Sequence, residues 1–112
     1  MPYFHYTSRK AAQDIICGHP SRIRPGLSGK VYVSPTRYLS GCEAAGWLAI
    51  QNLVEVACEI PAGGGAVLSQ PSRARKIKGP GGVIIRRGRG IEMSTSSEID
   101  VGGLRWVSLD EP

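Results

Sequence analysis

The sequence predicts a single α+β domain over residues 1–112, and three observations lead to this class. The chain has 112 residues, which is the length of one domain able to bury a core. Its 41% hydrophobic residues are enough to fold, while 15 glycines and 8 prolines favour turns and short strands over a helical bundle. The order of patterns is strand, helix, strand, helix and then mostly strands, which is typical of α+β proteins.

The N-terminal segment predicts a strand followed by a helix. Aromatic and polar residues alternate from Tyr3 to Thr7, as in a half-buried strand. Ser8 is a suitable N-cap for the helix that follows, and Gly18 is expected to end that helix. Four apolar residues support the helix by their spacing: Ala11, Ala12, Ile15 and Ile16.

The next elements are separated by clear turn signals. The stretch His19–Gly29 contains several prolines and glycines and is predicted to be a loop. Lys30–Ser34 is predicted to be a strand with Val31 and Val33 on one face and Tyr32 on the other. Cys42–Ile50 is predicted to be a short helix with an alanine-rich packing face.

The C-terminal half is predicted to be mostly strands. Leu53–Ile60 is apolar and ends at a proline, which predicts a strand. The stretch Ala62–Gly82 is rich in Gly, Ser, Pro and basic residues and is expected to be one long loop. The remaining predicted strands are Val83–Arg86, Ile91–Thr95 and Leu104–Leu109.

The charge and the cysteine content limit which partners and which cellular location are expected. The net charge is +5, and seven of the fourteen basic residues lie between Arg73 and Arg89. This cluster fits an acidic or nucleic-acid partner and equally fits a solvated loop. Three widely spaced cysteines do not describe a disulfide framework or a metal site, so they are expected to be buried thiols. No apolar run is long enough to span a membrane, so we expect a cytoplasmic protein or one delivered into a target cell's cytoplasm.

Four motifs, in order along the chain, carry a family resemblance. They are His5-Tyr6-Thr7, the loop Ile23-Arg24-Pro25, the strand Gly29-Lys30-Val31-Tyr32-Val33-Ser34-Pro35, and the helical stretch that begins Glu43-Ala44-Ala45. Together they resemble the small ADP-ribosyltransferases of the His-Tyr-acid class, which include toxin domains of bacterial polymorphic toxins and the rifamycin-modifying transferases. The segments Val56–Pro61, Gly90–Met93 and Leu104–Val107 resemble the second half of that family.

The resemblance implies a fold, a substrate and a set of site residues. It implies a split β-sheet core with two short helices, and NAD as the substrate whose nicotinamide–ribose bond is cleaved. It assigns His5 to the ribose hydroxyls, Tyr32 to stacking on nicotinamide, and Glu92 to the ribose 2′-hydroxyl and the developing cation. It further implies contacts to NAD from Tyr6, Thr7 and Ser34. Arg24 flanks the expected pyrophosphate site, where either it contacts the pyrophosphate or it is a plain exposed arginine. No metal is expected.

Several alternatives remain open at this level. Glu98 and Asp100 lie close enough in sequence to Glu92 to be the catalytic acid instead. The acceptor of ADP-ribose is a protein side chain, a nucleic acid or a small molecule, and water as acceptor would make the protein an NAD glycohydrolase. A toxin or effector of this kind would have an immunity or antitoxin protein as a partner. The alternative outside these classes is a non-enzymatic nucleic-acid-binding module that uses the basic cluster.

Overall fold

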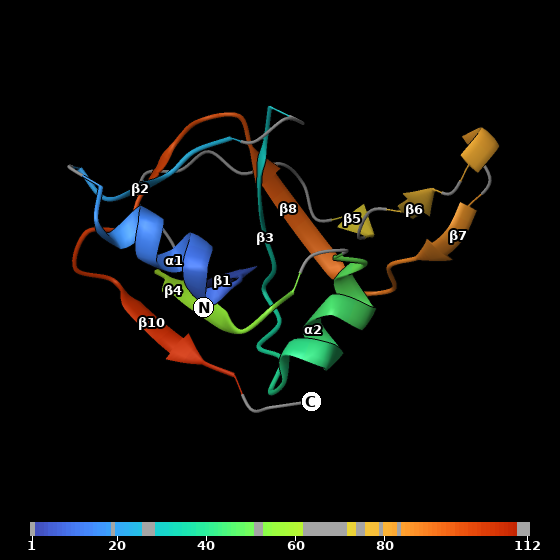
Figure 1. The fold of residues 1–112 in the computed structure, drawn as a ribbon, viewed down its shortest axis with the longest axis horizontal. Coiled ribbons are helices and arrows are strands. Elements are labelled where there is room, and N and C mark those ends of the chain that lie inside the picture. Colours follow the sequence, from blue (N-terminus) through green and yellow to red (C-terminus); the bar gives the residue numbers. More distant parts are fainter. Residues whose placement is uncertain are drawn as a thin grey trace.

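The structure is a computed structural model that describes residues 2–18, 20–25, 29–50, 53–61, 72–73, 76–78, 80–82 and 84–109. For residues 72–73, 76–78 and 84–87 it describes the main chain alone. The described chain is α+β, with two helices and antiparallel strands in separate small sheets (Figure 1). The predicted fold class is therefore confirmed.

The first sheet has the order β1-β4-β10, with β4 in the centre. β1 (Tyr3–Thr7) and β10 (Arg105–Ser108) both pair antiparallel with β4 (Val56–Ile60). β4 is buried along most of its length because apolar side chains cover both of its faces. Its Ala57 belongs to a core cluster with Phe4, Tyr6 and residues of the helix α2 (Gly41–Leu48), whereas its Cys58 belongs to a second cluster.

The second sheet has the order β3-β8-β5 and stands beside the first. β3 (Val31–Val33) and β5 (Ser72–Arg73) pair antiparallel with β8 (Ile91–Thr95). Two smaller antiparallel pairs complete the strands: β2 (Arg22–Ile23) with β9 (Ile99–Asp100), and β6 (Lys76–Lys78) with β7 (Ile84–Arg87). The β6–β7 pair extends away from the rest of the molecule, with the 3-10 turn η1 (Pro80–Gly82) at its tip (Figure 1).

The two sheets meet at one described bridge. The main chains of Phe4 and Ser34 exchange two hydrogen bonds of 2.8 and 2.9 Å. β1 and β3 are thus neighbours at one point and separate on either side of it, which gives the split-sheet core.

Both helices begin at serine N-caps that the sequence supplies. In α1 (Arg9–Ile16) the Ser8 side chain accepts a hydrogen bond from the Ala11 main-chain N–H at 3.1 Å. In α2 (Gly41–Leu48) the Ser40 side chain does the same for Glu43 at 3.0 Å. α2 ends at Ala49, which adopts the left-handed conformation (φ 53°).

Several predicted elements are confirmed. The strand Tyr3–Thr7 and the strand Ile91–Thr95 have the predicted bounds. The predicted helix after Ser8 is α1, although Gly18 does not end it in the left-handed conformation that we expected of a C-terminal glycine. In β3 the two valines are buried and Tyr32 is on the opposite, half-buried side, as the alternation predicted.

Other predicted boundaries were wrong by a few residues. The second helix begins one residue before Cys42 because Ser40 caps it, and it ends before Ile50 because Ala49 leaves the helical conformation. The strand predicted from Leu53 begins only at Val56. Leu53 itself is 67% exposed, so its apolar character was not a strand signal.

Two predicted loops contain strands. β2 lies within the predicted loop His19–Gly29, and residues 19 and 26–28 of that loop lie outside the described part of the chain. β5, β6 and η1 lie within the predicted loop Ala62–Gly82, of which residues 62–71, 74–75 and 79 are outside the description. β9 was also missed as an element. Strands of two or three residues are too short to show an alternating pattern, which is why sequence reasoning missed them.

Some burial predictions also need correction. Cys58 is fully buried as expected, but Cys17 and Cys42 are exposed. Cys17 follows the last residue of α1 and Cys42 lies in the first turn of α2, and both face solvent. Trp47 is 45% exposed, whereas Trp106 packs against the second core cluster.

Candidate functional site

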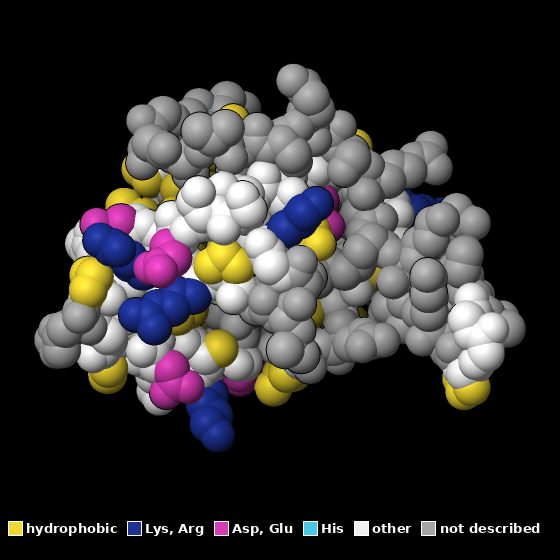
Figure 2. Space-filling view, turned by 90° about the horizontal axis from the view of Figure 1, so that it is seen from above, with side chains coloured by type: hydrophobic (Ala, Val, Ile, Leu, Met, Phe, Trp, Pro, Cys, Tyr) yellow, Lys and Arg dark blue, Asp and Glu magenta, His cyan; other side chains and the backbone are white. Residues whose placement is uncertain are grey.

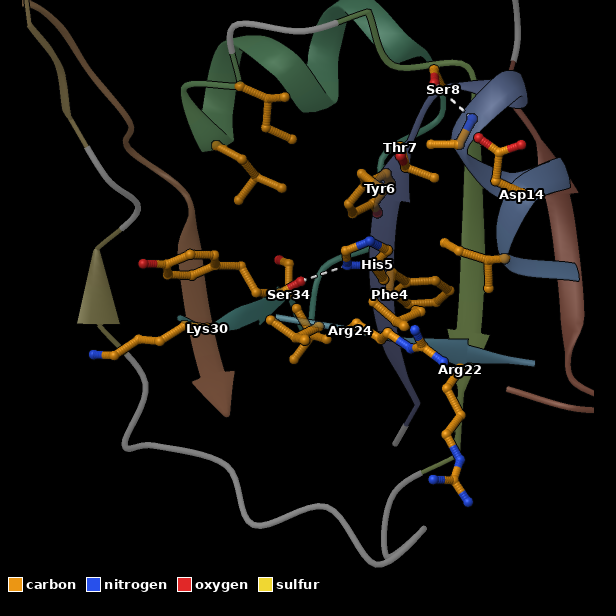
Figure 3. A pocket seen from close by; sticks show the side chains of 18 of the residues that line it. Phe4, His5, Tyr6, Thr7, Ser8, Asp14, Arg22, Arg24, Lys30 and Ser34 are labelled. Carbon is orange, nitrogen blue, oxygen red and sulfur yellow. Dashed lines mark hydrogen bonds between the residues drawn. The ribbon is translucent and has the colours of Figure 1, made fainter. Parts of the chain in front are cut away.

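A pocket of about 1010 Å³ brings together residues that are far apart in the sequence. Its walls come from β1, α1, the β2 region, β3, the end of α2 and one residue of β8. Figure 3 shows His5 near the middle, with Phe4 and Tyr6 on either side of it along β1. All seven candidate site residues from the sequence line this pocket: His5, Tyr6, Thr7, Arg24, Tyr32, Ser34 and Glu92.

His5 is held in place by a hydrogen bond across the split between the sheets. Its neighbours Phe4 and Tyr6 point into the core cluster under α2, so strand alternation directs the half-buried His5 side chain to the opposite face. The His5 Nδ1 lies 2.9 Å from the Tyr32 main-chain oxygen (Figure 3). Because a carbonyl oxygen only accepts hydrogen bonds, Nδ1 carries the hydrogen in this bond.

Tyr6 lines the pocket, and it also belongs to the core cluster under α2. Its hydroxyl donates to the Thr36 carbonyl at 2.6 Å and accepts from the Tyr38 N–H at 2.8 Å. Burial raises the pKa of the Tyr6 hydroxyl to about 12. Main-chain groups alternate in direction along a strand, so the N–H and C=O of Tyr6 point to the same side as those of Phe4, towards β3.

Ser34 ties the two site strands together. Its side chain is fully buried, and its hydroxyl donates to the Ile91 carbonyl at 2.8 Å. The same oxygen accepts from the Thr36 N–H at 3.2 Å. Ser34 therefore fixes the end of β3 against the residue that precedes Glu92 on β8.

Tyr32 and Glu92 share one face of the β3–β8 pair. Tyr32 lies opposite Ser94, and Glu92 is two residues from Ser94 on the same strand. Side chains two apart on a strand point the same way, so Tyr32 and Glu92 are diagonal neighbours, roughly 7–8 Å apart at their Cα atoms. Glu92 is only 5% exposed. A carboxylate in such a protected position interacts strongly with any positive charge that develops beside it.

The other two candidate acids lie elsewhere among the described residues. Glu98 forms ion pairs with Arg22 and Arg24, at 3.7 and 3.9 Å. Asp100 is exposed and accepts a hydrogen bond from the Gly102 N–H at 3.0 Å. Neither residue lines the pocket, and Glu92 does.

Arg24 lies at one end of the pocket together with Arg22. Figure 3 shows Arg22 and Arg24 beyond Phe4, at the opposite end from Thr7 and Ser8, and Lys30 also lines the pocket. All three are exposed. This end is therefore suited to an anionic group, whereas Leu48, Ile50 and Leu53 give the pocket an apolar wall.

Asp14 is a pocket residue that sequence reasoning missed. It lies on α1 and lines the pocket together with Ala11, Ile15 and Gly18. These four positions have the spacing of a single helical face. Asp14 is not one of the apolar residues from which the helix was predicted, so no local signal singled it out.

Most side chains of the basic cluster Arg73–Arg89 lie outside the described part of the structure, and Arg89, which is described, is exposed. In Figure 2 the described basic and acidic side chains are interspersed at the end of the molecule that carries α1 and β2. Among the described residues no group of three or more His, Cys, Asp or Glu could hold a metal ion, and none of the helices could cross a membrane.

The volume and lining of the pocket suit a small-molecule ligand. A pocket of this volume is at the upper end of the range for small-molecule sites. It combines an aromatic ring, an oriented imidazole, a protected carboxylate and a cationic end at Arg22 and Arg24, which we call the pocket mouth.

Comparisons of the chain with protein-family models, with curated proteins and with solved structures found no match.

Proposed function

We propose that the protein is an NAD-dependent mono-ADP-ribosyltransferase that acts as a toxin or effector. One observation carries the proposal. His5, Tyr32 and Glu92, which a family resemblance selects from three distant parts of the sequence, line the same pocket. Their position in one pocket supports the function that the resemblance implies.

The shape and chemistry of the pocket are compatible with NAD. The cationic mouth suits its diphosphate, since guanidinium groups bind phosphate oxygens with paired hydrogen bonds. The Tyr32 ring suits the planar nicotinamide, and the Tyr6 main-chain groups, which point to that side of β1, suit the amide. The His5 imidazole, which the bond to Tyr32 orients in the pocket, suits the ribose hydroxyls.

The chemistry proposed is cleavage of the bond between the ribose C1′ and the nicotinamide nitrogen. The bonding electrons leave with nicotinamide, and positive charge builds on the ribose, as in glycoside cleavage. Glu92 accepts the 2′-hydroxyl hydrogen bond and stabilises that charge. A nucleophile of the acceptor then bonds to C1′ and loses its proton to water. His5 and Tyr32 hold the ribose and the ring so that the bond can break.

Incubation with NAD labelled on its adenylate tests the acceptor. The purified chain is mixed with cell lysate, with and without nuclease treatment, and retained label is measured. Label on a nuclease-resistant species indicates a protein acceptor, and label that is lost with nuclease indicates a nucleic acid. Free nicotinamide without retained label indicates the NAD glycohydrolase or a small-molecule acceptor.

Variants in the same assay test the catalytic acid. Glu92→Gln is expected to lower turnover by about 10²- to 10³-fold, the scale seen when one stabilising group is removed. Asp100→Asn changes the same charge outside the pocket, and Glu43→Gln does so on the exposed side of α2. The proposal fails if Glu92→Gln turns over NAD as fast as Glu43→Gln. Nucleic-acid binding without NAD turnover would support the non-enzymatic alternative.

A further inference from the structure

The carboxylate of Glu98 forms ion pairs with the two arginines at the cationic end of the pocket. Glu98 Oε2 lies 3.7 Å from Arg22 Nη1 and 3.9 Å from Arg24 Nε, so one carboxylate oxygen serves both guanidinium groups. Both arginines line the pocket, and Glu98 does not. The carboxylate therefore approaches the arginines from outside the space that a ligand would occupy.

The β2–β9 pair produces this arrangement. Arg22 lies opposite Asp100 and Ile23 opposite Ile99, so continuing the antiparallel register places Arg24 opposite Glu98. Ile23 and Ile99 are 3% and 5% exposed and anchor the pair in the core. Strand alternation then puts both arginines together on the outer face. Because Asp100 accepts a hydrogen bond from the turn at Gly102, Glu98 is the carboxylate that meets them.

The contacts between Glu98 and the arginines are loose. Both separations are longer than a hydrogen bond, and the three side chains are 42–72% exposed. Exposed ion pairs of this kind contribute little stability. A ligand with a higher negative charge density can therefore take the guanidinium groups from Glu98 at small cost.

We propose that Glu98 is a competing counter-anion of the pocket mouth, which lowers the affinity of Arg22 and Arg24 for a phosphate-bearing ligand and sets the ionic selectivity of the site. The carboxylate keeps the two arginines near one another when no anion is bound. It also repels each incoming phosphate. Two unit charges roughly 6 Å apart in water change a binding constant by about threefold per unit of charge, and physiological salt reduces the effect. In this role Glu98 is a positioning residue and not the catalytic acid.

The inference deepens the proposed function but does not need NAD turnover for its test. Inorganic pyrophosphate is the probe, and its binding is measured by isothermal titration calorimetry at low and high salt. Glu98→Gln is expected to bind pyrophosphate at least threefold more tightly than the unmodified chain at low salt, because pyrophosphate carries more than one negative charge, and the difference is expected to shrink at high salt. Arg22→Gln and Arg24→Gln are each expected to weaken binding severalfold.

Two controls separate a local from a general charge effect. Glu98→Asp keeps the charge and is expected to bind like the unmodified chain. Glu43→Gln makes the same change in net charge on α2, outside the pocket, and is also expected to leave binding unchanged. The inference is overturned if Glu98→Gln binds pyrophosphate equally well or more weakly, if Glu43→Gln tightens binding to the same extent, or if the unmodified chain binds no pyrophosphate.

Enzyme kinetics give a separate readout. In Glu98→Gln the KM for NAD is expected to fall about threefold while kcat stays within twofold, because Glu98 acts on binding alone. A large loss of kcat would instead make Glu98 the catalytic acid and overturn the inference. If no chain turns over NAD, the proposed function fails, and the pyrophosphate titrations still decide the role of Glu98.

Discussion

The His5 imidazole donates a hydrogen bond from Nδ1 to the Tyr32 main-chain oxygen at 2.9 Å, and this bond crosses from one sheet to the other. It lies beside the two main-chain bonds between Phe4 and Ser34, where β1 and β3 meet. The same contact therefore does two things. It holds the sheets together at the split, and it orients the imidazole in the pocket.

Substitutions of His5 separate these two roles. His5→Asn keeps an N–H donor near the position of Nδ1, so it is expected to retain most of the link to Tyr32. His5→Ala removes the link and is expected to lower the free energy of unfolding by about 1 kcal/mol. Both variants lack the imidazole, so both are expected to lose NAD turnover. Urea unfolding and nicotinamide release measure the two effects; turnover that survives in either variant would exclude a catalytic role for His5.

Ser34→Ala is expected to destabilise the site strands. It removes the donor to the Ile91 carbonyl and the acceptor for the Thr36 N–H at a fully buried position. Leaving such groups unsatisfied costs about 1–3 kcal/mol, to be measured by urea unfolding. Ser40→Ala, which removes the N-cap of α2, is the comparison and is expected to cost about 1 kcal/mol. A negligible effect of Ser34→Ala would mean that its hydrogen bonds do not hold β3 to β8.

Gly90→Ala is expected to disturb the start of β8. The Gly90 N–H donates to the Trp47 carbonyl at 2.8 Å, which joins the end of α2 to the strand that carries Glu92. A β-carbon at Gly90 would overlap the Tyr38 hydroxyl and lie 3.1 Å from Leu48 Cδ2. The expected cost is about 1–3 kcal/mol of unfolding free energy, measured as a lower Tm.

Gly102→Ala is the matched control for that change. A β-carbon there lies 3.3 Å from Asp100 Oδ1, at the end of a flexible side chain. We expect a change in Tm close to zero. Equal losses in the two variants would argue against the close packing described at Gly90.

Stability is expected to fall at alkaline pH. Burial raises the pKa of the Tyr6 hydroxyl from 10.0 to about 12 and that of the Cys58 thiol from 9.0 to about 12. Between the unfolded and folded pKa values the unfolded chain loses these protons first, so the stability that the neutral groups provide is fully present below pH 9 and is lost as pH rises towards 12. Urea unfolding at pH 8 and pH 10.5 measures the loss.

The variant Tyr6→Phe identifies the source of that loss. It lacks the titrating hydroxyl, so its unfolding free energy is expected to depend less steeply on pH above 10 than that of the unmodified chain. Its stability at pH 8 is expected to be lower because the hydrogen bonds to Thr36 and Tyr38 are gone. A pH dependence identical to that of the unmodified chain would show that Tyr6 does not titrate as described.

Much of the fold could be predicted because its main elements carry strong local signals. The alternation in Tyr3–Thr7 and the N-cap at Ser8 are local features, and the corresponding strand and helix form as expected. The N-cap at Ser40 is also a local feature, but it was not used in predicting α2. β2 and β9 could not be predicted, since each has two residues and exists only because the other pairs with it. The exposure of Trp47 and Leu53 also depends on tertiary packing that no local pattern records.

The candidate site also depends partly on local sequence and partly on tertiary packing. The sequence could name His5, Tyr32 and Glu92 only through resemblance, because each is an ordinary strand residue by its local context. That they line one pocket is a property of the fold. The contacts of Arg22 and Arg24 with Glu98, and the position of Asp14, depend on which elements come together in space.

The central claim is that this pocket cleaves NAD, and the rate of nicotinamide release tests it most directly. The purified chain is incubated with NAD and nicotinamide is quantified over time, in parallel with His5→Ala, Glu92→Gln and the control Glu43→Gln. The account predicts release by the unmodified chain and by Glu43→Gln, with a loss of about 10²-fold or more in the two pocket variants. No release by the unmodified chain under any acceptor condition, or equal release by all four proteins, would contradict it.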